Sequence, residues 1–219
     1  RSVDLGMTIS TGEIVTPITT VGASDLTLTA KAGDVTANVT KTSLYGGAGS
    51  GTITLNAQGT PRIGVDFDLE KVDAGFAAQE LAGITRLEGT GNVNITNLSA
   101  RGQSQSQLVR SLNGSIELDL DDGAIKGVNL GKIGRAALQT YDTLTSENGG
   151  FSGANLPSLV GSFNDVVTQA RGPAEETDFS SFRVKLNAAN GVVTSDAMEI
   201  EGPYYRVTGN ARVNLPQQN

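Results

Sequence analysis

Residues 112–130 have the sequence Leu-Asn-Gly-Ser-Ile-Glu-Leu-Asp-Leu-Asp-Asp-Gly-Ala-Ile-Lys-Gly-Val-Asn-Leu, and this stretch shows how most of the chain is built. Its apolar residues Ile116, Leu118 and Leu120 alternate with acidic residues. Because neighbouring side chains of a strand point to opposite faces of a sheet, the alternation predicts a strand with one apolar and one polar face. Asp122-Gly123 then favours a tight hairpin turn, since both residue types accept positive φ. A second strand and the start of a helix are predicted to follow.

The same alternation recurs along the chain on both sides of this stretch. The residues that share a parity in each run are Val3, Leu5, Met7 and Ile9; Leu26 and Leu28; Val35, Ala37 and Val39; Ile53 and Leu55; Ile63, Val65, Phe67 and Leu69; Phe182, Val184 and Leu186; and Tyr205, Val207, Ala211, Val213 and Leu215. Many short runs with turn residues between them are typical of an antiparallel β protein. The Gly-rich segment 44–51 predicts a bulge or a wide turn, and residues 146–157 and 171–178 predict loops.

Helical signals are fewer, and each rests on a capping residue or on apolar residues at steps of three and four. The predicted helices and their caps are residues 74–82 with Asp73 and Gly83, residues 105–112 with Ser104, residues 130–145 with Asn129, and residues 158–170. With 219 residues, we expect a single domain over 1–219. The sequence therefore predicts a mainly β fold of the β-rich α+β class, a long curled antiparallel sheet with two to four short helices packed on it.

Composition argues against several classes of function. The formal net charge of −7 would repel the phosphates of a nucleic acid, so we expect no nucleic-acid partner. The same charge argues against electrostatic docking of the chain on an anionic membrane. The chain has no Cys and no His, which removes thiol chemistry, the commonest general base and the commonest metal ligand. We therefore expect no enzymatic activity, no metal and no cofactor.

Apparent catalytic and ligand-binding motifs have the wrong spacing. Asp119, Asp121 and Asp122 resemble part of a Ca²⁺ loop, but an EF-hand needs Gly at its sixth position and Glu at its twelfth, where this chain has Ala124 and Leu130. A solvated strand face explains these aspartates better. Serine nucleophiles lack a His partner, and although a Ser–Lys arrangement stays open, no spacing supports one. The sequence thus offers no candidate catalytic, metal-binding or cofactor-binding residues.

The segment 127–133 resembles a phosphate-binding loop only superficially. Such a loop has four residues between its glycines and Ser or Thr after its Lys, whereas here three residues separate the glycines and Ile133 follows the Lys. The start of a helix explains the segment better.

The apolar side of the predicted strands is the candidate functional surface. It would carry Ile53, Leu55, Val65, Phe67, Leu69, Val93, Ile95, Ile116, Leu118 and Leu120. Two interpretations stay open. Helices such as 130–145 would cover this surface and make an ordinary core, in which each large side chain contributes about 1.5–3 kcal/mol. Alternatively, part of the surface would stay open as a groove for acyl chains.

Four ordered motifs resemble the C-terminal region of the AsmA family of Gram-negative envelope proteins. The first is the Leu-Tyr-Gly-Gly segment at 44–47, and the second is the strand entry Leu-Glu-Gly-Thr-Gly-Asn-Val-Asn-Ile at 87–95. The third is the block 111–130, and the fourth is the closing run 182–215. Their order and spacing match the family over roughly residues 25–215. Asn129 stands where the family usually has Asp, a change that preserves N-capping.

The resemblance implies a periplasmic segment with a non-enzymatic role in outer-membrane biogenesis. It also implies a longer protein held to the inner membrane by an N-terminal helix that this sequence does not include. Larger relatives resemble long curled sheets with an apolar trough that is proposed to conduct phospholipid. Phospholipid or another acyl lipid is therefore one expected partner.

Two other functions stay open at this stage. The first is an interaction module that assists outer-membrane β-barrel proteins through an unpaired sheet edge. The second is a glycan-directed envelope enzyme, which would need a pair of carboxylates facing each other across a cleft.

Overall fold

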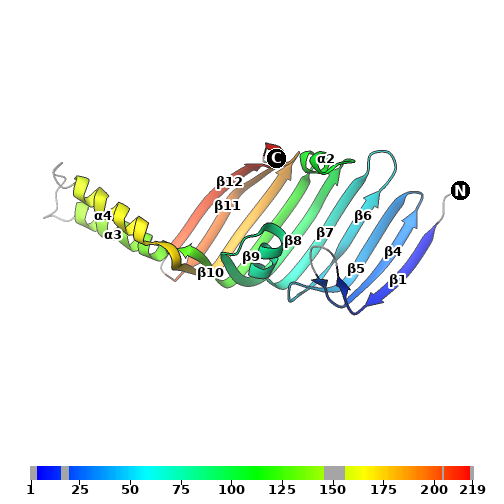
Figure 1. The fold of residues 1–219 in the computed structure, drawn as a ribbon, viewed down its shortest axis with the longest axis horizontal. Coiled ribbons are helices and arrows are strands. Elements are labelled where there is room, and N and C mark those ends of the chain that lie inside the picture. Colours follow the sequence, from blue (N-terminus) through cyan, green and yellow to red (C-terminus); the bar gives the residue numbers. More distant parts are fainter. Residues whose placement is uncertain (1–3, 16–19, 146–155, 204, 218–219) are drawn as a thin grey trace.

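The chain folds into one open, curved antiparallel sheet that takes up most of the molecule (Figure 1). The computed structural model describes residues 4–15, 20–145, 156–203 and 205–217. The sheet has ten strands in the order β1-β4-β5-β6-β7-β8-β9-β10-β11-β12. Their bounds are β1 Leu5–Thr11, β4 Ser24–Lys31, β5 Asp34–Leu44, β6 Gly47–Asn56, β7 Arg62–Asp73, β8 Leu87–Arg101, β9 Asn113–Val128, β10 Arg171–Ala189, β11 Val192–Gly202 and β12 Tyr205–Asn214. The predicted fold class is confirmed.

From β4 to β12 consecutive strands pair with each other, so this part of the sheet is a meander, and β1 pairs with β4 at its edge. A separate small hairpin of β2 (Ile14–Val15) and β3 (Thr20–Val21) lies between β1 and β4 in the chain. The sheet does not close, and β1 and β12 are its two edges. Figure 1 shows the strands of the large sheet side by side from the blue edge to the red edge.

The register of the strands aligns the apolar residues of each strand with those of its neighbours across the sheet. Phe67 on β7 lies opposite Ile95 on β8, and Ile95 lies opposite Ile116 on β9. Side chains that lie opposite each other in a ladder point to the same side, so one face is apolar across many strands. Register shifts interrupt most of the strand pairs, and such bulges bend and twist a sheet.

The predicted turn at Asp122-Gly123 is wrong, because β9 runs through it without reversing. Asp122 does have a positive φ of 46°, but the residue forms a bulge: Thr90 pairs with Asp121 while Glu88 pairs with Ala124. Between these two pairs β9 advances by three residues, from Asp121 to Ala124, while β8 advances by only two. A type I′ turn needs positive φ at both central residues, and here only Asp122 has it.

Two other local predictions need correction. The Gly-rich segment 44–51 turns only at Tyr45 and Gly46, and from Gly47 onward it is strand β6. Residues 171–178, predicted as a loop, form the first part of β10, where Glu176 pairs with Lys126 of β9. Of the predicted loop 146–157, residues 146–155 lie outside the described residues, and α4 begins at Leu156.

The four predicted helices are present, with small shifts at their ends. They are α1 (Ala74–Ala82), α2 (Gln105–Arg110), α3 (Leu130–Thr145) and α4 (Leu156–Gln169), followed after β12 by a short 3₁₀ turn, η1 (Leu215–Gln217). The predicted caps are correct for α1, where Asp73 accepts from the Phe76 N–H at 2.9 Å, and for α3, where Asn129 accepts from the Lys132 N–H at 2.9 Å. Helix α1 lies against β7 and β8, whereas α3 and α4 form a hairpin that projects away from the sheet (Figure 1).

Candidate functional site

The structure brings all the predicted groove residues onto one face of strands β6 to β9. In the ladders Ile53 lies opposite Val65, and Leu69 lies between Gly49 and Val93. Leu118 lies opposite Val93 and continues the row onto β9, and the other predicted residues form parallel rows. We call this side of the sheet the apolar face. Register extends it to residues that were not predicted as part of it, namely Leu5, Met7, Leu28, Val35, Ile63 and Leu98 on one side and Phe182, Val184, Met198, Ile200, Val207 and Val213 on the other.

Helix α1 covers one end of the apolar face and makes a true core there. Tyr45, Leu69 and Val72 form one buried cluster, and Ala77 of α1 packs against it. Ala74 of α1 packs with Leu120 and Phe179 in a second cluster. Leu120 has no exposed surface, and Leu69 is 8% exposed. At this end the predicted residues therefore act as packing residues.

The apolar face is open at the other end of the same strands. Ile53 is 41% exposed and Leu55 is 39% exposed on β6, and Ile63 beside them on β7 is 38% exposed. Leu5 and Met7 on the β1 edge are exposed as well. The remaining predicted residues between the two ends are half-buried: Val65, Phe67, Val93, Ile95, Ile116 and Leu118. Helix 130–145 was one candidate cover for this surface, but α3 lies off the sheet (Figure 1) and leaves it open.

The opposite face of the sheet is polar and is held by cross-strand ion pairs. Arg183 lies 3.3 Å from Asp119, and Arg206 lies 2.8 Å from Glu199. The hydrogen bond to Glu199, together with its charge, raises the pKa of the Arg206 guanidinium. Such exposed pairs contribute little stability individually, but they mark this face as the solvated one. Asp119 thus lies on the solvent-exposed face of its strand, as the alternation predicts.

A depression of about 580 Å³ lies beside α1, and two of the three carboxylates that line it, Asp73 and Glu88, have structural partners. Asp73 caps α1, and Glu88 forms an ion pair with Lys126 across the β8–β9 ladder. The hydrogen bond and the charge of Glu88 raise the pKa of the Lys126 ammonium. Within the described part of the chain, no three acidic residues are grouped so that they could hold a metal ion. Asp73 and Glu88 are thus engaged in capping α1 and in pairing β8 with β9, and Asp122 is the third carboxylate of the lining.

Near the red edge, Tyr205 ties β12 to the neighbouring strands. Its hydroxyl donates a hydrogen bond to the Asp178 carbonyl oxygen of β10. Partial burial, with a smaller effect of the Asp178 charge, raises the pKa of this phenol. Tyr205 thus stabilises the corner of the sheet and offers no free reactive group.

Among the described residues, no helix is both long enough and apolar enough to cross a bilayer. In comparisons with known proteins, the model of the AsmA family matches residues 15–198. No curated protein and no solved structure matches the chain.

Proposed function

The chain belongs to the AsmA family, and from this premise we propose that it is a non-enzymatic periplasmic domain that binds acyl lipid on the open part of its apolar face. Membership of the family points to a role in outer-membrane biogenesis or lipid transport. The proposal further includes attachment of the full-length protein to the inner membrane.

The observation that carries this proposal is the exposure of neighbouring large apolar side chains on β6 and β7. Ile53, Leu55 and Ile63 are all more than one-third exposed, and they lie side by side in the β6–β7 ladder. Soluble proteins seldom leave contiguous apolar patches open unless something binds there. Covering such surface gains about 25 cal/mol per Å² of apolar area, so an extended hydrocarbon chain lying on it would be held without any polar contact.

The chemistry of the open part favours hydrocarbon over other ligands. The row that contains Leu55 continues through Val35 and Ile63 and carries no charged side chain. The next row contains Ile53 and Val65 and is also uncharged. A surface with no hydrogen-bonding side chain recognises shape and apolarity, which fits the acyl portion of a lipid.

A charge placed on the open face tests this function. We expect Leu55→Glu to weaken binding of a fluorescent fatty acid by about tenfold or more, because an acyl chain would then have to desolvate a carboxylate. Leu55 is 39% exposed, so the protein should still fold, which circular dichroism would check. Thr54→Glu is the matched control, since Thr54 is exposed on the polar face of the same strand. Equal binding by both variants, or no lipid bound by the unmodified protein, would refute the proposal.

The β1 edge favours a second candidate function, an interaction with outer-membrane proteins by strand addition. Leu5–Thr11 lies at the edge of the sheet and contains no charged residue and no Pro, although such residues normally protect exposed edges. Site-specific photocrosslinking from Thr8 in the periplasm would trap a partner barrel protein if this function exists. The same crosslinker at Thr208 on the β12 edge provides the comparison.

A further inference from the structure

Two arginines face each other across the β7–β8 ladder at the end of the sheet far from α1. Arg62, the first residue of β7, pairs in register with Arg101, the last residue of β8. Their neighbours Ile63 and Ala100 belong to the apolar face, so the side chains of Arg62 and Arg101 leave the strands on the polar face. Residues opposite each other in a ladder have Cβ atoms about 4.5–5.5 Å apart, and like charges in this arrangement repel.

Several other basic residues on the polar face lie beside acidic ones, although Arg212 has no ion pair among the described residues. Lys185 pairs with Glu117, Arg183 with Asp119, and Lys126 with Glu88. In contrast, neither Arg62 nor Arg101 has a side-chain ion pair or hydrogen bond within the described residues. The chain has 23 acidic residues and 16 basic ones, so acidic partners are not scarce.

The two arginines line a shallow depression of about 260 Å³ whose other walls are fixed by hydrogen bonds. The Ser111 hydroxyl accepts from the Arg101 N–H and donates to the Arg101 carbonyl oxygen, both at 2.7 Å. Asn113 accepts from the Asn190 N–H at 3.1 Å. Ser111 and Asn113 of the wall are thus engaged, whereas the guanidinium groups of Arg62 and Arg101 have no acceptor among the described residues.

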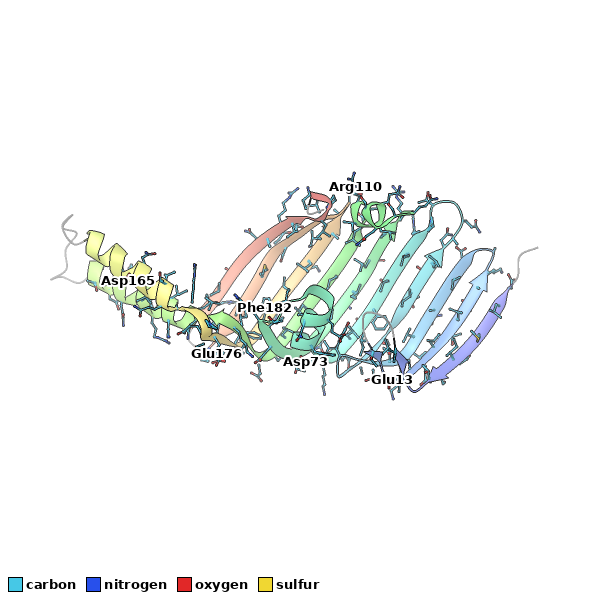
Figure 2. All side chains as sticks on the ribbon, in the orientation of Figure 1. Glu13, Asp73, Arg110, Asp165, Glu176 and Phe182 are labelled. Atoms are coloured by element: carbon cyan, nitrogen blue, oxygen red, sulfur yellow. The ribbon has the colours of Figure 1, made fainter. Side chains whose placement is uncertain are left out.

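Some charged residues lie at opposite ends of the strands. Arg110, at the end of α2, lies at the same end of the sheet as the paired arginines, whereas Asp73, Glu176 and Glu13 lie at the opposite end (Figure 2). Arg62, Arg101 and Arg110 thus gather at one end of the strands, where Asp34 lies two strands from Arg62 in the same row.

We propose that Arg62 and Arg101 form a binding site for a phosphate-type oxyanion. Guanidinium groups present paired N–H donors in a fork that matches two oxygens of a phosphate, and a bound dianion would replace their mutual repulsion with attraction. The oxyanion comes either from a soluble phosphate compound or from a lipid headgroup. The site lies on the polar side of the sheet and does not depend on acyl binding to the apolar face.

The test is a titration of the whole chain with inorganic phosphate, followed by NMR of the arginine Nε–H groups. We expect saturable shifts of Arg62 and Arg101 and none of Arg212, which lies on the polar face of β12 without an ion-pair partner among the described residues. The double variant Arg62→Gln/Arg101→Gln should bind phosphate at least about tenfold more weakly, whereas Arg212→Gln, which changes one charge in the same way, should bind normally.

The source of the oxyanion is determined by flotation with phosphatidylcholine vesicles that contain or lack phosphatidylglycerol. Binding that needs phosphatidylglycerol and is lost in the double variant supports the site and identifies a headgroup as its ligand. Phosphate binding without vesicle binding supports the site and identifies a soluble ligand. No saturable shift together with no vesicle binding would overturn the proposal, as would binding that persists in the double variant.

Discussion

Glycines on β6 allow neighbouring strands and an aromatic ring to come unusually close. A Cβ atom at Gly51 would lie 2.3 Å from the Asp66 carbonyl oxygen and 2.5 Å from the ring of Phe67. Contacts this short do not occur between real atoms, so any larger residue must push β7 or Phe67 aside. The ring can lie over β6 only because Gly51 has no side chain.

The close approach at Gly51 predicts that a larger residue there destabilises the protein. We expect Gly51→Ala to lower the free energy of unfolding by about 1–3 kcal/mol, as other over-packed sites do. Gly209→Ala on β12 is the control, since nothing lies within 4 Å of a Cβ atom placed there. Urea denaturation followed by circular dichroism would measure both. A Gly51→Ala protein as stable as the Gly209→Ala protein would contradict the packing described here.

At the scale of secondary structure, helices were predicted better than strand boundaries. Helix α1 begins and ends where Asp73 and Gly83 predict, because caps act through hydrogen bonds within a few residues. The hairpin turn predicted at Asp122-Gly123 was wrong because hairpin turns and β-bulges favour similar residues. Only the pairing of β9 with Thr90 and Glu88, far away in the sequence, distinguishes the two.

The α3–α4 hairpin is an appendage of the sheet, whereas α1 is part of its core. Val128 and Arg171, which flank the hairpin, pair directly in the β9–β10 ladder. A two-residue Asn-Gly turn could therefore join β9 to β10 in place of residues 129–170. The deletion removes the buried residues Ala136 and Ala170, but no member of the two buried clusters under α1, so we expect it to lower the free energy of unfolding less than removal of α1 does.

The matching control deletes α1 by joining Asp73 to Leu87 through a short turn. This control should destabilise the protein much more, because it removes Ala74 and Ala77 from the two buried clusters. Urea denaturation compares the two proteins. If removal of α3 and α4 abolished cooperative unfolding, the hairpin would have to be considered part of the core.

For the molecule as a whole, the single layer of strands leaves a large surface. Its accessible area is 13763 Å², whereas a compact protein of 22.6 kDa is expected to expose about 9,500 Å². We therefore expect a urea m-value smaller than that of a two-layer domain of equal length, because m scales with the area exposed on unfolding. Equilibrium urea denaturation measures it. An m-value typical of a compact domain would mean that the apolar face is buried in solution, for example against a second copy.

The sequence identified the apolar face but not its division into a covered and an open part. Alternation places Leu55 and Leu120 on the same side of the sheet, and the register confirms that they share it. Their exposure differs because α1 lies beside Leu120 and nothing lies over Leu55 among the described residues. The position of α1 over the sheet depends on the path of the chain after β7. The alternation of apolar and polar residues carries no information about that path. The sequence analysis also missed Arg62 and Arg101, because only the β7–β8 register brings these two residues opposite each other.

The meander order has a consequence for how this molecule can change in length. Since β5 to β12 pair in the sheet only with their neighbours in sequence, the sheet behaves as a linear array whose cohesion is a sum of adjacent interfaces. Insertion or loss of a β-hairpin would lengthen or shorten the array without rebuilding a central core. Evolution can therefore adjust the span of such a protein two strands at a time, with the apolar surface growing in proportion.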